Sequence, residues 1–162
     1  MITPEKYLAA VHNEYRIIRH LAEKIPHDAH GYRPSDKQRS TVELLGYLTV
    51  IGSSMMHSLL NNGAWPDYYT ELMNSVTIDN FAERLNDEEN RIKENFAKFT
   101  PEMMDEKIDL FGMGHAETVA DYLMDLIQIL SAYKMQLFLY IKASGVTNIG
   151  TSNAWGGMDM NA

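Results

Sequence analysis

The stretch TVADYLMDLIQILSAYKMQLFLYIKAS, residues 118–144, decides the fold of this chain. Thr118 and Asp121 form a helix-capping pattern at its start, and Gly145 follows its end. Its apolar positions recur at alternating spacings of four and three residues, which places them on one face of an α-helix. The stretch therefore predicts a helix over 118–144 that packs against other helices. These positions are Val119, Leu123, Leu126, Leu130, Tyr133, Leu137 and Tyr140.

Three further segments repeat apolar residues at helical spacing. Thr3-Pro4-Glu5 is a helix start, and Ser40 to Glu43 is a capping box. Proline or glycine follows the first and second segments, as helix ends require. Because no segment shows the period of a strand, the chain is predicted to be all-α, an antiparallel four-helix bundle. The predicted helices are 3–25, 40–60, 78–98 and 118–144.

The segments between and after these helices are predicted from their polar and turn-forming residues. Residues 86–91 (NDEENR) are expected to be a solvated helix face, and 109–115 (DLFGMGH) a bend or short extended piece. Residues 64–76 are expected to be a loop or a short irregular helix. The bundle should occupy 1–145, and 146–162 should be an irregular tail, either loose or pinned by Trp155.

Composition limits the classes of partner. The chain has 162 residues, with 14 Lys and Arg against 22 Asp and Glu, which gives 14 − 22 = −8. Without a basic tract, no nucleic-acid partner is expected. There is no cysteine, no signal-peptide pattern and no run of about 18 apolar residues. We therefore expect a single-domain cytoplasmic protein that does not enter a membrane.

Three local motifs occur in order along this helical pattern. They are YRPS at 32–35, Ser-x-x-Glu-Leu-Leu-x-x-Leu at 40–48, and Gln-Leu-x-x-Tyr-Ile-x-x-x-Gly at 136–145. Together they resemble the DinB family, which includes YfiT-like metal-dependent hydrolases and thiol transferases. The resemblance covers roughly residues 5–145. It implies a four-helix bundle and, as is common in that family, a homodimer.

The resemblance also implies where a metal site would lie. Metal-binding members of the family hold nickel or zinc with three histidines, one on the second helix and an H-x-x-x-H pair on the last. In this sequence those positions are Tyr47, Ile129 and Tyr133. Isoleucine cannot ligate a metal, and a neutral phenol with a pKa near ~10 is a poor ligand. We therefore expect a degenerate metal site, with no metal and no other cofactor.

The same positions define the candidate site residues. Tyr47, Ile129 and Tyr133 are expected to line the cleft, and the two tyrosines either fill it or leave a ligand cavity. Asp125 stands one turn before Ile129, so it is either an exposed helix charge or an acid in the cleft. Gln136 is expected to be a hydrogen-bond partner at the cleft edge or a contact between helices.

Three functions from different classes follow. The first is a metal-free DinB-like protein that binds a small molecule or is otherwise non-catalytic. The second is a hydrolase or thiol S-transferase with an atypical site that uses Tyr47, Tyr133 and Asp125. The third is a structural or interaction protein. The sequence shows no Ser–His–Asp arrangement and no phosphate-binding glycine loop, so it gives no independent indication of catalysis.

Overall fold

A computed structural model describes residues 3–160, so residues 1–2 and 161–162 of the predicted bundle and tail lie outside the described part. The described chain is mainly helical, with one two-stranded antiparallel sheet in which Lys107 pairs with Thr118. The elements, in chain order, are α1 (Pro4–Ala22), α2 (Thr41–Leu48), α3 (Ile51–Leu60), α4 (Tyr69–Asn74), α5 (Phe81–Phe96), a 3₁₀ turn η1 (Pro101–Asp105), β1 (Lys107–Ile108), β2 (Glu117–Thr118), α6 (Val119–Ala143) and a π-helical turn η2 (Ser152–Gly156).

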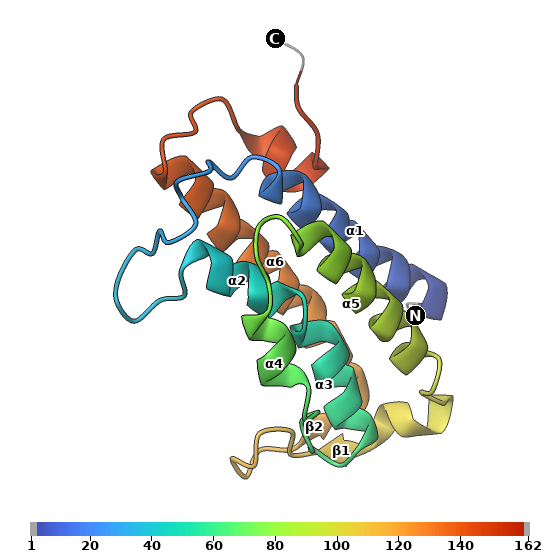
Figure 1. The fold of residues 1–162 in the computed structure, drawn as a ribbon. Coiled ribbons are helices and arrows are strands. Elements are labelled where there is room, and N and C mark those ends of the chain that lie inside the picture. The colour runs from blue at the N-terminus through green and yellow to red at the C-terminus, as the bar shows by residue number, and fades with distance from the viewer. Residues whose placement is uncertain (1–2, 161–162) are drawn as a thin grey trace.

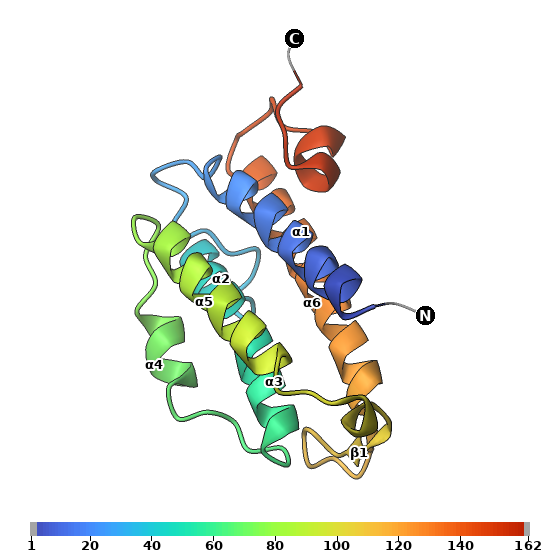
Figure 2. The same cartoon turned by 90° about the vertical axis from the view of Figure 1, so that its right-hand side faces the viewer.

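The four predicted helices form a bundle of α1, α2 with α3, α5 and α6 (Figure 1). Helices α1 and α6 lie side by side and run in the same direction: Tyr7 bonds the carbonyl of Leu123, and Glu14 pairs with Lys134 farther along both helices. Helices α2–α3 and α5 run the opposite way (Figure 2). The prediction of an all-α four-helix bundle is confirmed, and its antiparallel contacts lie between these two pairs.

The apolar stripes of the four helices meet in one core. The periodic positions of α6 that were predicted from the sequence are buried in it, including Leu126, Leu130 and Leu137, except Tyr133, which is half-buried. They pack against the corresponding stripes of α1, α2 and α3, and burial of this apolar surface is the main force that holds the bundle together.

The second predicted helix is broken at Thr49 and Val50, so the prediction of one continuous helix over 40–60 is wrong. Val50 has φ −138° and ψ −20°, outside helical geometry. The break leaves backbone groups without partners inside the helix, and residues of α5 replace those partners. Arg91 donates to the carbonyl of Thr49 at 3.0 Å, and the N–H of Ser53 donates to Glu88 at 2.8 Å.

The prediction of a solvated face over 86–91 is also wrong at one residue. Glu88 is completely buried, whereas its neighbours Asn86 and Asn90 are exposed. The sequence pattern is polar throughout. Polarity alone did not distinguish the carboxylate of Glu88, which accepts a hydrogen bond from the start of α3, from carboxylates that face water.

The connections match their predictions more closely. Residues 109–115 form a turn between β1 and β2, with positive φ at Gly112 and Gly114. Residues 64–76 contain the short helix α4, which packs on α2.

The C-terminal segment is docked on α1, but not through Trp155, which is 66% exposed. Ile149, Asn153 and Ala154 are buried instead, and Asn153 lies 3.1 Å from the His20 ring. The segment is therefore held by these buried residues and by hydrogen bonds from Arg16 to the carbonyls of Gly156 and Gly157. In the part of the chain that the structure describes, no helix combines the length and apolar character needed to cross a membrane.

Candidate functional site

Tyr47 on α2 and Tyr133 on α6 lie against each other across the bundle. Their ring centroids are 4.7 Å apart, and the ring planes are inclined by 55°. Tyr47 is buried and Tyr133 is half-buried. The structure thus brings together two of the three residues at the positions that the resemblance assigns to metal ligands. The third, Ile129, is half-buried one turn earlier on α6 and packs against the core.

Arg39 completes this cluster, and the sequence analysis did not single it out. Its guanidinium lies 4.1 Å from the centroid of the Tyr47 ring and 5.8 Å from that of Tyr133. One of its nitrogens donates to the Tyr133 hydroxyl at 3.4 Å. Arg39 directly precedes Ser40, the N-cap of α2, and this place next to the capping box is the sequence signal that could have indicated it.

Gln136 supports the backbone of Arg39. Its side-chain amide donates to the Tyr140 hydroxyl, which in turn donates to the Arg39 carbonyl at 3.0 Å. Gln136 is therefore linked to the backbone of Arg39 through Tyr140. Asp125 lies farther away on α6, half-buried and within 3.4 Å of Gln128 on its own helix. Its pKa is raised, mainly by burial and also by Glu117 and Asp121.

The phenols of Tyr47 and Tyr69 are held in their protonated form. Burial raises the pKa of Tyr47, the neighbouring Tyr133 and Tyr69 raise it further, and the Arg39 guanidinium opposes this only in part. Burial also raises the pKa of Tyr69 on α4. Because neutral phenols donate hydrogen bonds, these hydroxyls and the guanidinium form a set of donors.

This donor set does not fit a divalent metal ion. Nickel and zinc are bound by imidazole, thiolate or carboxylate, whereas these positions offer an alkyl group and two phenols. The raised pKa of Tyr47 opposes formation of a phenolate, and the adjacent guanidinium would repel a cation. Within residues 3–160, no three His, Cys, Asp or Glu side chains gather in an arrangement that could hold a metal.

A cavity of about 380 Å³ adjoins Arg39. The loop before α2 forms one side of it through Lys37 and Arg39, and Met73 and Asn74 of α4 form the opposite side. Val42 and Val76 add apolar surface. The cavity therefore combines the charged side chains of Lys37, Arg39 and Glu43 with the apolar surface of Val42, Met73 and Val76.

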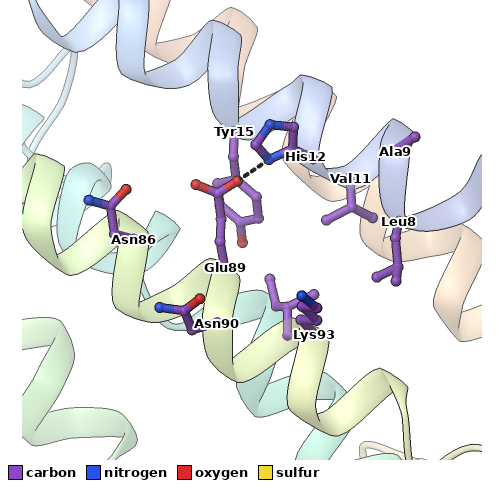
Figure 3. A pocket seen from close by; sticks show the side chains of 10 residues that line it. Leu8, Ala9, Val11, His12, Tyr15, Asn86, Glu89, Asn90 and Lys93 are labelled. Carbon is purple, nitrogen blue, oxygen red and sulfur yellow. Dashed lines mark hydrogen bonds and ion pairs between the residues drawn. The ribbon is translucent and has the colours of Figure 1, made fainter. Parts of the chain in front are cut away.

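A second cavity, of about 610 Å³, runs between α1 and α5. Figure 3 shows that His12 and Glu89 point toward each other across it and that Tyr15 lies behind them. Glu89 is also bonded to Arg19 at 2.8 Å. The two charged groups at its centre, His12 and Glu89, are thus already engaged with each other.

The buried Glu88 forms a polar network behind that groove. Its carboxylate accepts hydrogen bonds from the backbone and hydroxyl of Ser53 and, at 3.1 Å, from Arg91. Asn95 donates to the carbonyl of Ser53. Burial raises the pKa of Glu88 to about 6, and these hydrogen bonds offset part of that shift. The network supplies hydrogen-bond partners to the backbone at the break between α2 and α3.

The helical bundle has a DinB-like fold. A crystal structure of a DinB-like protein from Bacillus subtilis superposes on this chain with a TM-score of 0.69, at 19% sequence identity, over 90% of this chain and 95% of that one. No protein-family model matches the sequence, and no curated protein sequence matches it either. The likeness is therefore one of fold.

Proposed function

We propose that this protein binds a small organic molecule without a metal ion, in the cavity beside Arg39. The observation that carries the proposal is the position of the Arg39 guanidinium, 4.1 Å from the ring of Tyr47. A protein cation thus lies beside a position that the DinB resemblance assigns to a metal ligand. The adjoining cavity of about 380 Å³ falls within the range of small-molecule sites.

The same geometry argues against the alternative of a hydrolase or transferase. A general base needs a pKa near the working pH, whereas the pKa of Tyr47 is raised. Asp125 bonds to Gln128 on its own helix. The cluster therefore provides binding groups, and no base is positioned among them.

Thermal denaturation in the presence of a chelator tests the proposal. A ligand that binds only the folded protein at a hundredfold excess over its Kd stabilises it by about 2.7 kcal/mol. Screening a panel of neutral and charged small molecules should give compounds that raise the melting temperature of the wild type. Asn74→Trp, which fills the cavity at Arg39, should abolish that rise.

The matched control is Asn90→Trp, which places the same bulk in the groove between α1 and α5. It should leave the ligand effect intact. A panel without any stabilising compound, or stabilisation that requires added nickel or zinc, would contradict the proposal.

A further inference from the structure

Arg39 differs from the other arginines in what it contacts. Arg19, Arg33, Arg84 and Arg91 each pair with a carboxylate. Arg16 donates instead to the backbone carbonyls of Gly156 and Gly157. Among residues 3–160, Arg39 pairs with no carboxylate and donates only to a phenol. The absence of a carboxylate partner for Arg39 is unexpected, because acidic residues outnumber basic ones in this chain and its net charge is −8.

The surroundings of Arg39 leave its donors available. A guanidinium that stacks on an aromatic ring is held by the ring face, while its N–H groups point outward in its own plane. Those groups match the two oxygens of a carboxylate, and the pairing is bidentate. The Tyr47 ring therefore orients Arg39 without using its hydrogen-bonding capacity.

The nearby carboxylate does not compete for this guanidinium. Glu43 lines the same cavity, but its side chain accepts a hydrogen bond from the backbone of Ser40 at 2.6 Å and pairs with Arg33 at 3.2 Å. The Tyr133 hydroxyl lies 3.4 Å from Arg39 and is able to donate to an oxygen held there.

We propose that the cavity takes a small organic monocarboxylate, whose carboxylate pairs with the Arg39 guanidinium and whose apolar body lies against Met73, Val42 and Val76. Lys37, Arg39 and Glu43 line the cavity and together carry a formal charge of +1, which matches a monocarboxylate better than a phosphate dianion. This inference rests on the proposed function and names the ligand class for the same site.

Binding of matched probes tests the inference. We would titrate the protein with benzoate, benzamide, hexanoate, hexanamide and inorganic phosphate at constant ionic strength and follow binding by ligand-observed NMR. Benzoate and hexanoate should bind at least tenfold more tightly than their amides and than phosphate. Arg39→Gln should lower carboxylate affinity at least tenfold, and Arg39→Lys should lower it too, because lysine keeps the charge but loses the planar pair of donors.

Arg16→Gln is the control for net charge, because Arg16 also lacks a carboxylate partner but lies on α1, against the C-terminal segment. It should leave carboxylate binding unchanged. Circular dichroism and melting temperature verify that each variant is folded, and Tyr133→Phe tests the site if Arg39→Gln unfolds, with a several-fold loss of carboxylate affinity expected.

Equal binding of acids and amides, blocked by Asn74→Trp, would overturn the carboxylate inference and leave the proposed function standing. Binding of phosphate in preference to both acids, or of no probe at all, would also overturn the inference. The chelator screen decides the proposed function separately, because its panel includes neutral compounds of other classes.

Discussion

At the scale of single residues, the hydroxyl of Tyr47 stays protonated because burial raises its pKa. Its partner Tyr133 and the Arg39 guanidinium make the cluster a set of donors that suits an anion. Arg39 therefore opposes cation binding at this cluster as much as the residues at the three positions that the resemblance assigns to metal ligands.

Rebuilding a metal site tests this dependence. Tyr47→His, Ile129→His and Tyr133→His together restore three imidazoles, at a cost of about 1–3 kcal/mol to the metal-free protein because packed volume is lost. We expect the triple variant to bind zinc weakly, since the Arg39 guanidinium, which lies 4.1 Å from the Tyr47 ring, would repel the ion, and to bind it at least tenfold more tightly when Arg39→Met is added. Calorimetric titration measures both affinities, and equal affinities would show that Arg39 does not face the three positions.

Glu88 gives a prediction about pH. Its pKa of about 6 in the folded state lies above its ordinary value of 4.5, so the folded protein binds more protons than the unfolded chain between these values. The contribution of Glu88 to stability therefore falls by about 2 kcal/mol as pH rises from below 4.5 to above 6. Urea denaturation of the wild type and Glu88→Gln at several pH values should show their difference changing by that amount, whereas parallel profiles would contradict the buried assignment.

Some of these residues could be predicted from the sequence and others could not. Tyr47 and Tyr133 were identified because the DinB resemblance assigns roles to their positions, and the structure places their rings in contact. Arg39 lies in a polar loop without periodicity, and Glu88 lies in a run of polar residues. Both depend on contacts between segments far apart in the sequence, which a single sequence does not report.

At the scale of elements, the close contact of α2 with α4 depends on a glycine. A Cβ atom at Gly46 would lie 2.2 Å from the backbone oxygen of Met73, so any larger residue must displace α4. We expect Gly46→Ala to lower the free energy of unfolding by about 1–3 kcal/mol, despite the higher helix propensity of alanine. Because α4 carries Tyr69 and Met73, carboxylate binding should weaken as well.

The control for this prediction is Gly31→Ala, since a Cβ at Gly31 meets no atom within 4 Å. Its effect should be small or slightly stabilising, because alanine restricts the unfolded chain. Chemical denaturation measures both variants. Equal stabilities of the two variants would mean that α4 is not fixed against Gly46.

Helix positions followed well from the sequence because capping and periodicity are local. The Ser40–Glu43 capping box and the Thr118 cap both occur in the structure. The break at Thr49 and Val50 was missed because apolar spacing continues across it from Leu48 to Ile51. The groups that stabilise the break, Glu88 and Arg91, belong to α5. Capping and periodicity within one segment do not report such contacts.

At the scale of the whole molecule, the C-terminal segment adds to the bundle. Ile149 is 4% exposed, and its truncation leaves a cavity against the bundle. We expect Ile149→Ala to cost about 2–4 kcal/mol of unfolding free energy. Trp155→Ala should cost about 1 kcal/mol or less, because Trp155 is exposed and contacts Lys134 only at 5.5 Å from the ring. Thermal denaturation ranks the two, and the reverse order would contradict docking through Ile149.

The bond from the Ser53 N–H to Glu88 also has a consequence for folding. A residue early in a helix normally relies on a cap within a few positions, but here the acceptor is 35 residues later in the chain. The first turn of α3 therefore cannot form this hydrogen bond until α5 has packed against it. This dependence couples α3 and α5 into one cooperative unit. Amide hydrogen exchange should then protect Ser53 as strongly as the central residues of α6, since its proton is released only by global opening.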